Sequence, residues 1–333
     1  MGIADMQQCD WYGKPYYSLD AWCRNTFAHK CYKIALNAHM TCPNRDGTLD
    51  TRGCIFCSAG GSGDFAVDIA GKSVETQLEE GLARLKDKFS AGEAACLIAY
   101  FQAYTNTYAP VEYLRKVYTE ALDCPLVCGI SIGTRPDCLP EEVLELLQEL
   151  KNSYPHKFIW IELGLQTIHD KTADFIRRGY ALSCFEEAVH KLNALEIPVI
   201  VHLILGLPGE TEDMMLESVD YLNERKPFGV KLQLLHFLRG TELGELYVAG
   251  ANCTTDGLTD NPALTPLTQE EYLRILINCI RRLSPEIVIH RLTGDGPGKS
   301  LIAPTWSLNK RNVLNSLHRQ MQRLEARQGD MRR

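Results

Sequence analysis

The chain has 333 residues, of which 45% are hydrophobic and 23% are charged, which supports a soluble globular chain with a proper core. Its formal net charge of −7 provides no overall attraction to nucleic acid. The longest apolar stretch, residues 197–207, is too short to span a bilayer, and the N-terminus has no apolar signal segment. We therefore expect a cytoplasmic protein without a membrane partner.

The predicted elements alternate between short apolar strands and helices. Strands are expected at residues 32–37, 97–102, 127–133, 158–164, 198–205 and 230–236, with a seventh at 287–290. Helices are expected at residues 74–89, 111–122, 141–152, 185–194, 212–225 and 269–283. Several helix starts are marked, by first-turn prolines at Pro110 and Pro140 and by capping-box pairs at Ser183 with Glu186 and Thr268 with Glu271. Six to seven such units without a dinucleotide fingerprint favour a full or partial α/β barrel.

Polar residues recur on one side of the expected strands, although strands buried on both faces should be almost entirely apolar. These residues are Lys33, Asn37, Tyr100, Gln102, Ser131, Glu162, Gln166, His202, Lys231 and Gln233. One of them would fit a satisfied polar group in the core. One on nearly every strand indicates a lined cavity, because several unpaired buried groups would be costly. Barrel sites open at the C-terminal ends of the strands, where we expect this cavity.

Cys42, Cys54 and Cys57 lie on one loop after the first expected strand. Thiolates prefer zinc, copper(I) or iron–sulfur, and the last two cysteines bring two sulfurs onto one centre. A structural zinc ion needs four ligands, and Cys31 or His39 is available to complete that set. A four-iron cluster held by three cysteines keeps one iron open to a small molecule. Free thiols that happen to be close are the third interpretation.

The other ten of the thirteen cysteines have ordinary interpretations. An odd number in a chain without a secretory signal argues against a disulfide framework. Most are expected to be small buried hydrophobic residues or incidental thiols, the former at Cys96, Cys128 and Cys279 and the latter at Cys9, Cys23 and Cys253. Cys124 and Cys138 flank an expected strand, and either is a candidate for a second reactive group.

The cysteine loop ends in Cys-x-aromatic-Cys, with Phe56 directly before Cys57. This pattern resembles the cluster loop of the radical S-adenosylmethionine (SAM) superfamily, whose usual spacing is Cys-x3-Cys-x2-Cys. Here eleven residues separate Cys42 from Cys54, which resembles the elongator-catalytic-subunit-like branch and its YhcC-type family. Stretches that match this family are CPNRDGTLDTRGCIFCSAGGSGDFA, AYFQAYTNTYAPVE, GISIGTRPDCLP, ELGLQT, LILGLPGE, HRLTGDGP and APTWSLNK.

The resemblance implies a partial (β/α)6 TIM-like barrel of the radical SAM type. Residues 1–30 would form an N-terminal extension, 31–240 the barrel, and 241–333 a C-terminal extension with a basic terminal helix. The three loop cysteines would bind a [4Fe–4S] cluster that reductively cleaves SAM, and the resulting 5′-deoxyadenosyl radical would abstract hydrogen from a substrate.

The resemblance also implies which residues contact SAM. Asn106 lies where the superfamily contacts the methionine amine, and Gly206 lies in a turn that resembles the adenine-contacting turn. Contacts to the carboxylate, ribose or amine are expected from Ser131, Thr134, Arg135, Glu162, Gln166 and Arg178. Arg177 and Arg178 also fit a solvated helix end. Expected substrate-side residues are Lys231, Gln233, His236, His290, Arg291 and Asp295, and His236 is also a candidate for cofactor binding.

The elongator-like resemblance suggests modification of the wobble uridine of tRNA, with an electron donor of the flavodoxin or ferredoxin type. Residues 309–333 contain seven Lys and Arg against Glu325 and Asp330, which suits either RNA phosphates or a solvated amphipathic cap over the barrel. The alternative substrate is a small metabolite of the tetrapyrrole type. The alternative function is a zinc-stabilised barrel without catalysis, which metal content distinguishes.

Overall fold

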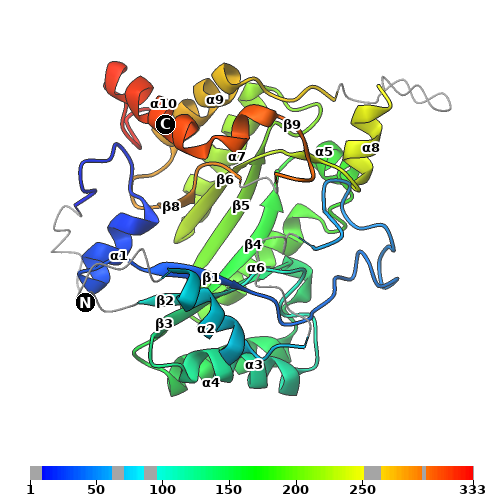
Figure 1. The fold of residues 1–333 in the computed structure, drawn as a ribbon, viewed down its shortest axis with the longest axis vertical. Coiled ribbons are helices and arrows are strands. Elements are labelled where there is room, and N and C mark those ends of the chain that lie inside the picture. Colours follow the sequence, from blue (N-terminus) through cyan, green and yellow to red (C-terminus); the bar gives the residue numbers. More distant parts are fainter. Residues whose placement is uncertain (1–9, 62–70, 86–95, 251–263, 295–297, 333) are drawn as a thin grey trace.

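The computed structural model describes the chain except residues 1–9, 62–70, 86–95, 251–263, 295–297 and 333. Its centre is a curled open sheet of seven parallel strands in the order β1-β2-β3-β4-β5-β6-β8 (Figure 1). The strands are β1 (Tyr32–Leu36), β2 (Leu97–Phe101), β3 (Val127–Thr134), β4 (Phe158–Gln166), β5 (Val199–Leu205), β6 (Gly229–Leu234) and β8 (Val288–Arg291). The sheet does not close, so β1 and β8 are its edges.

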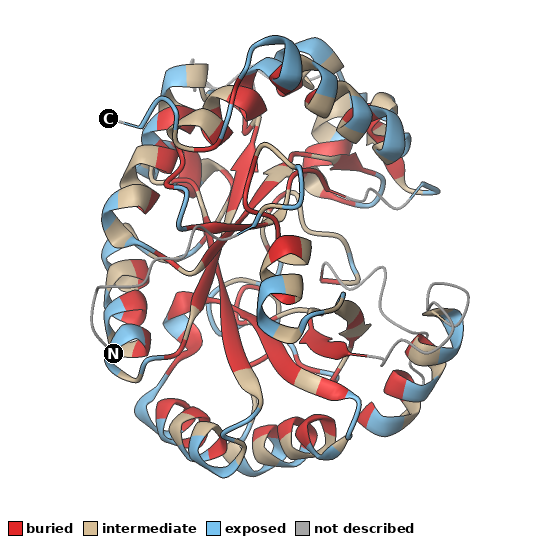
Figure 2. Ribbon diagram, turned by 90° about the vertical axis from the view of Figure 1, so that its left-hand side faces the viewer, coloured by how far each residue is buried: buried red, intermediate tan, exposed pale blue. Residues whose placement is uncertain are grey.

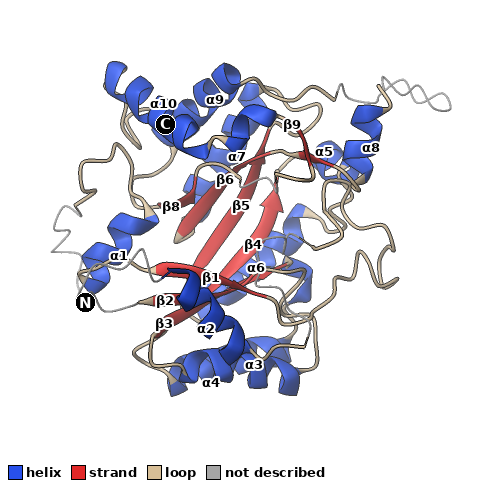
Figure 3. Cartoon of the chain, in the orientation of Figure 1, coloured by secondary structure: helices blue, strands red, loops and turns tan. Residues whose placement is uncertain are grey.

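Helices follow the strands and lie outside the sheet (Figure 3). They are α2 (Val74–Leu85), α3 (Val111–Asp123), α4 (Glu141–Ser153), α6 (Leu182–Ala194), α7 (Glu212–Arg225) and α9 (Gln269–Arg282), with α10 (Lys310–Arg323) packed on α9. Shorter elements are α1 (Leu19–Phe27), α5 (Asp170–Phe175), α8 (Glu242–Val248) and the antiparallel pair β7 (Phe237–Leu238) and β9 (Leu301–Ala303). The architecture is the predicted partial α/β barrel, with β8 as the seventh strand.

The expected helix starts are confirmed in part. Thr268 and Glu271 form the predicted capping box of α9. The box predicted for Ser183 and Glu186 is wrong, because α6 already begins at Leu182 and its N-cap is Ala181, whose side chain has no polar atom. Glu186 instead accepts hydrogen bonds from side chains of α7. The predicted continuation of α2 to residue 89 lies outside the described residues.

The concave side of the sheet is layered along the strands. Near the N-terminal ends, Ile98, Trp160 and Ile200 form an apolar layer. Trp22 of α1 packs against it, with its ring centroid 5.0 Å from that of Trp160. Two residues further along the same strands, Tyr100, Glu162 and His202 replace the apolar side chains. Figure 2 shows buried strands at the centre and helices whose outer faces are exposed, so this polar layer lies inside the molecule.

Residues beyond 240 take part in the sheet through β8 and in the outer layer through α9 and α10. Helix α10 buries Val313, Leu317 and Met321. The division of the chain at residues 30 and 240 stays a prediction. No helix in the described part of the chain combines the length and the apolar character that crossing a membrane requires.

Candidate active site

One cavity lies at the C-terminal ends of the strands and includes the cysteine loop. Eleven residues that the sequence singled out line it, from the loop and from four strands or the segments that follow them: Cys42, Cys54, Cys57, Thr134, Arg135, Glu162, Gln166, Arg178, Lys231, Gln233 and Arg291. Tyr100, Gln102 and His202, expected on the polar side of the strands, line it too. The repeated polar positions therefore mark a lined cavity, as predicted.

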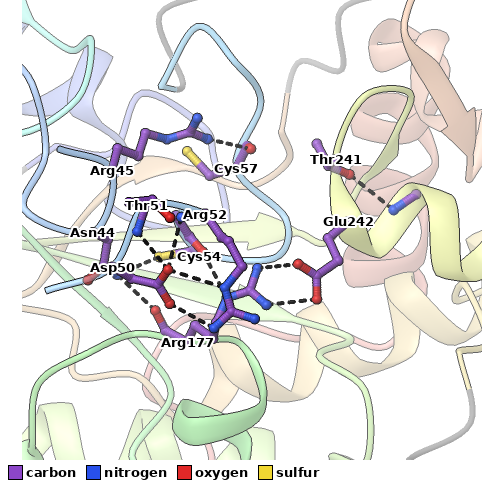
Figure 4. Close-up of polar contacts among 12 residues, drawn as sticks. Asn44, Arg45, Asp50, Thr51, Arg52, Cys54, Cys57, Arg177, Thr241 and Glu242 are labelled. Atoms are coloured by element: carbon purple, nitrogen blue, oxygen red, sulfur yellow. Dashed lines mark hydrogen bonds and ion pairs between the residues drawn. The ribbon is translucent and has the colours of Figure 1, made fainter. Parts of the chain in front are cut away.

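The cysteine loop is held by its own polar side chains (Figure 4). Arg45 donates hydrogen bonds of 2.7 Å to the carbonyls of Cys57 and Ser58. The Asn44 amide lies 3.6 Å from Cys54 Sγ and donates to the Arg177 carbonyl at 2.9 Å. These contacts hold the backbone at Cys57 and Ser58 and place an amide donor beside the sulfur of Cys54.

The spacing of the three loop thiols does not suit a single metal ion. Ligands of one zinc ion lie about 4 Å apart, since each Zn–S bond is about 2.3 Å. Within the described residues, the Sγ atoms of Cys42, Cys54 and Cys57 do not all lie within 4.8 Å of one another. Within the described residues, neither suggested fourth zinc ligand forms a compact set with the loop thiols: Cys31 precedes β1, at the other end of the strand, and His39 is exposed.

The loop is also anchored to the opposite wall. Arg177, in a left-handed backbone conformation after α5, donates to the Gly53 carbonyl at 3.0 Å and forms a bidentate ion pair with Glu242 of α8, at 2.7 and 2.6 Å (Figure 4). The backbone of Ile55 accepts a hydrogen bond from Leu243 at 2.9 Å. The interpretation of Arg177 as a solvated helix end is therefore wrong.

Glu162 of β4 is the centre of a buried charge network, with none of its side chain exposed. One carboxylate oxygen accepts hydrogen bonds from Lys33 and Ser131, both at 2.6 Å. The other accepts from Lys231 and from His202 Nε2, the latter at 2.7 Å. Burial alone would raise the pKa of Glu162, but the charges of the two lysines and the histidine hydrogen bond hold it well below its usual range.

The hydrogen bonds of His202 define its neutral form. Its Nε2 atom donates to Glu162, because a carboxylate only accepts. Its Nδ1 atom lies 3.5 Å from the amide nitrogen of Gln233, which donates to it. Burial, together with repulsion from Lys231, lowers the pKa of His202 to about 4 despite its contact with Glu162. The ring is therefore neutral at physiological pH, and its two hydrogen bonds connect Glu162 to Gln233 at the cavity wall.

The cavity is strongly basic although the chain is acidic. Its described lining includes one carboxylate, that of Glu162, and five cationic side chains: Arg45, Arg135, Arg178, Lys231 and Arg291. Arg135 is neutralised in part by Asp137, at 2.9 and 2.7 Å. The excess positive charge favours ligands that carry carboxylate or phosphate groups.

Arg178 is buried, with 2% of its surface exposed, and lines the cavity. It donates to the backbone carbonyls of Leu165 and Thr167 at 3.0 and 2.6 Å, while its Nη2 atom has no hydrogen-bond partner among the described residues. The solvated interpretation is therefore wrong for Arg178 as well. A buried guanidinium nitrogen with spare donor capacity suits an anionic ligand.

The family follows from sequence comparison. Residues 51–222 match the model of the radical SAM superfamily, and residues 227–323 match that of the radical SAM C-terminal domain. This chain belongs to the radical SAM superfamily. It is a radical SAM enzyme, and the superfamily uses a [4Fe–4S] cluster together with SAM.

The similar proteins confirm the YhcC-type branch. The uncharacterized protein YtqA of Bacillus subtilis is 40% identical over 316 residues, which cover 95% of this chain and 92% of YtqA. The protein YhcC of Escherichia coli is 34% identical over 284 residues, which cover 85% of each protein. Among solved structures, the archaeal Elp3 of Methanocaldococcus infernus has a TM-score of 0.62 at 16% identity, covering 90% of this chain and 64% of that one. This last likeness concerns the fold.

The cysteine loop of this radical SAM enzyme fits a multi-iron cluster. It supplies three soft ligands to one cavity, with spacing too wide for one ion. Burial, with repulsion from Cys57, raises the pKa of the Cys54 thiol to about 12. A thiolate at Cys54 therefore needs a cationic partner, which an iron ion provides.

Several residues expected in the site lie outside its lining. Ser131 is fully buried and contacts Glu162, while Asn106 donates to the Gly133 carbonyl at 2.9 Å behind the wall. Gly206 faces Leu267, and the His290 ring packs edge-on against Trp160 and Phe228 in the apolar layer. His236 lies against Gly294, and Asn37 contacts Gln77 of α2. Asp295 lies outside the described residues.

Sequence reasoning missed the supporting residues of the site. Asn44 and Arg45 stand inside the loop, and their polar character in a segment flanked by cysteines was an available signal. Tyr180 lines the cavity, donates to the Gly164 carbonyl at 2.7 Å, and has the Arg135 guanidinium 4.8 Å from its ring centre. Nothing in the local sequence distinguishes this tyrosine from an ordinary buried one.

Proposed function

We propose that Cys42, Cys54 and Cys57 bind the [4Fe–4S] cluster and that the basic cavity beside them holds SAM. The observation that carries this proposal is that the three thiols open into the same cavity as the polar strand ends. When bound, the cluster would supply the electron that cleaves SAM to methionine and a 5′-deoxyadenosyl radical able to abstract hydrogen.

The side chains of the chain itself bind, orient and exclude water in this proposal. Arg178 offers its free Nη2 donor to the carboxylate of SAM. Gln166 and Thr134 lie at the strand ends where ribose hydroxyls would be bound. Lys231 and Arg291 line the wall formed by β6 and β8 and would face the substrate. Asn106 and Ser131 would act from behind the wall, by holding Gly133 and Glu162 in place.

We propose tRNA as the substrate, modified at the wobble uridine, with an electron donor of the flavodoxin or ferredoxin type. Support comes from the elongator-like sequence pattern, from the fold likeness to Elp3, and from a basic cavity in a chain of charge −7. Net charge would repel RNA, whereas the cavity and the basic residues of α10 would attract phosphates locally. A cytoplasmic location stays a prediction.

Product analysis after anaerobic reconstitution tests the chemistry. The protein is reconstituted with iron and sulfide, reduced with dithionite and mixed with SAM, and 5′-deoxyadenosine is measured by mass spectrometry. We expect product from the wild type and from Cys184→Ala, whose partly buried thiol lies on α6. We expect none from Cys54→Ala, together with loss of iron. Equal product from Cys54→Ala would contradict the assignment.

The substrate is tested separately. Bulk tRNA and a tetrapyrrole such as coproporphyrinogen are each added to the reaction, and the rate of 5′-deoxyadenosine formation is compared with the rate without addition. Acceleration by tRNA, with modified uridine found after nuclease digestion, is the expected result. Acceleration by the tetrapyrrole alone would replace tRNA by a small metabolite and leave the cluster assignment intact.

A further inference from the structure

A second group of cysteines lies at the opposite end of the sheet from the cavity. Cys31 precedes β1, Cys96 precedes β2, and Cys128 lies at the start of β3. The sulfur atoms of Cys31 and Cys96 are 3.2 Å apart, and both thiols also contact that of Cys128. Far apart in sequence, these residues meet because parallel strands begin at the same edge. The expectation that Cys96 and Cys128 are only small hydrophobic residues does not account for this gathering.

A β-bulge directs Cys128 toward the group. Leu97 pairs with Val127 and Ile98 pairs with Gly129, so Cys128 is the extra residue of the bulge, without a register partner on β2. A bulge interrupts the hydrogen-bond ladder and turns the extra side chain away from its regular alternation. Here the extra residue brings a third sulfur to Cys31 and Cys96, and its thiol also donates to the Leu97 carbonyl at 3.1 Å.

A histidine completes the group. One ligand atom each of His29, Cys31 and Cys96 lies within 4.8 Å of the other two. His29 follows α1, and its Nδ1 atom lies 3.3 Å from the Lys30 carbonyl, which leaves Nε2 as the ligand atom. Metal-binding histidines commonly use the other ring nitrogen in this way, because the hydrogen bond fixes the tautomer.

We propose that His29, Cys31, Cys96 and Cys128 form a structural zinc site. Three sulfurs and one imidazole nitrogen make a tetrahedral set that zinc favours, with ligand atoms about 4 Å apart. The compact spacing of His29, Cys31 and Cys96 suits a single ion, in contrast to the wider spacing of the loop thiols, and Cys128 adds a sulfur that contacts both of the other thiols. The ion would join the turn after α1 to the starts of the first three strands (Figure 1).

The neighbouring Cys23 is assigned to the wall of this site. Its thiol also contacts Cys31, but it is 1% exposed and packs with Ile98, Trp160 and Ile200 in the apolar layer. His29 and Cys31, by contrast, are half-buried, which gives an ion a path from solvent. Zinc would displace the protons of the three thiols, which pass to solvent.

Metal content tests the proposal when the cysteines of the cluster loop have been removed, so that iron or zinc bound by that loop does not contribute. The chain carrying Cys42→Ser, Cys54→Ser and Cys57→Ser is purified and analysed by inductively coupled plasma mass spectrometry, and we expect about one zinc per chain. Adding Cys31→Ser and Cys96→Ser should reduce zinc to background. The matched control adds Cys124→Ser and Cys138→Ser instead and should retain it. Zinc absent from the first protein, or iron in its place, would overturn the proposal.

Two further measurements cover variants that fail to fold and define the ligands. In the wild type, zinc should protect Cys31, Cys96 and Cys128 from alkylation, as mapped by mass spectrometry, and a chelator should remove that protection. Alkylation unchanged by zinc, or a disulfide between Cys31 and Cys96, would contradict a metal site. In the protein with the three loop cysteines replaced by serine, adding His29→Gln should abolish zinc binding, and adding Cys23→Ala should preserve it. The reverse result would overturn this ligand set.

Discussion

At the scale of single residues, one carboxylate organises the interior of the barrel. Glu162 accepts hydrogen bonds from side chains of β1, β3, β5 and β6. Buried charges of this kind contribute little net stability as a set, but removing one partner exposes the others to the full cost of burial. The members of the network are therefore compatible with burial only as a complete set.

Glu162→Gln should destabilise the fold by about 3–5 kcal/mol, because Lys33 and Lys231 would be left buried without an opposing charge. Urea denaturation at neutral pH measures the difference. Glu196→Gln provides the control, since the Glu196 side chain is 87% exposed and pairs with Lys151 at the surface, and it should change stability little. An equally stable Glu162→Gln variant would show that the lysines are neutral.

His202→Gln should change how stability depends on pH. The folded chain holds the pKa of His202 at about 4, whereas an unfolded histidine titrates near 6.5. Between these values the unfolded chain binds more protons, so the wild type should lose up to about 1.4 kcal/mol for each unit that the pH falls. The variant should lack this contribution. If the free energies of unfolding of the wild type and of the variant changed in parallel from pH 7 to 4.5, that result would contradict the neutral, buried ring.

At the scale of elements, the cysteine loop depends on a segment more than a hundred residues away in the sequence. Arg177 connects the backbone of Gly53 to α8 through Glu242. A long loop closed only by its own contacts would be mobile, and this link ties it to the rigid barrel wall.

Arg177→Met should make the loop accessible to protease. Limited trypsin digestion would then cleave after Arg52, whose side chain is 62% exposed, several times faster than in the wild type. Arg225→Met is the matched control, because Arg225 forms an ion pair with Glu186 at 2.5 Å between helices remote from the loop. Similar cleavage rates in the two variants would show that the loop holds its shape without α8.

The elements were largely predictable, and their local exceptions were not. All seven strands of the parallel sheet fall within two residues of their expected bounds, because apolar runs between marked helices dominate the pattern. The bulge at Cys128 and the packing of Trp22 against the apolar layer depend on tertiary contacts that no local pattern encodes. The same reason explains the failed capping box, since contacts with α7 occupy Glu186.

The site was predictable in its place and its cysteines, but its pairings were not. Alternating polar positions revealed the cavity, because strand geometry alone fixes which side chains share a face. Which lysine meets Glu162, and that His290 faces the apolar layer, depend on strand order and curvature. Arg178 was misjudged in part for this reason, since only the folded turn after α5 buries it.

At the scale of the whole molecule, a chain of net charge −7 contains a basic cavity. If tRNA binds there, its affinity should fall with salt, with a logarithmic slope of about −0.7 to −0.9 for each phosphate contacted. Arg291→Gln should make this slope less steep by about the contribution of one phosphate contact. Arg319→Gln, on the exposed face of α10, tests the basic terminal helix in the same way. Binding that is flat between low and moderate salt would exclude a phosphate-rich ligand.

The open sheet gives the charge network a mechanical consequence. A closed barrel is braced by backbone hydrogen bonds around its whole circumference, whereas this sheet ends at β1 and β8 and does not close. Lys33 on the first edge and Lys231 beside the other both reach across the interior to Glu162. Their attraction to this carboxylate holds the two sides of the sheet together and so sets its curvature. A ligand that binds either lysine would weaken this attraction, and the width of the cavity would then adapt to the ligand.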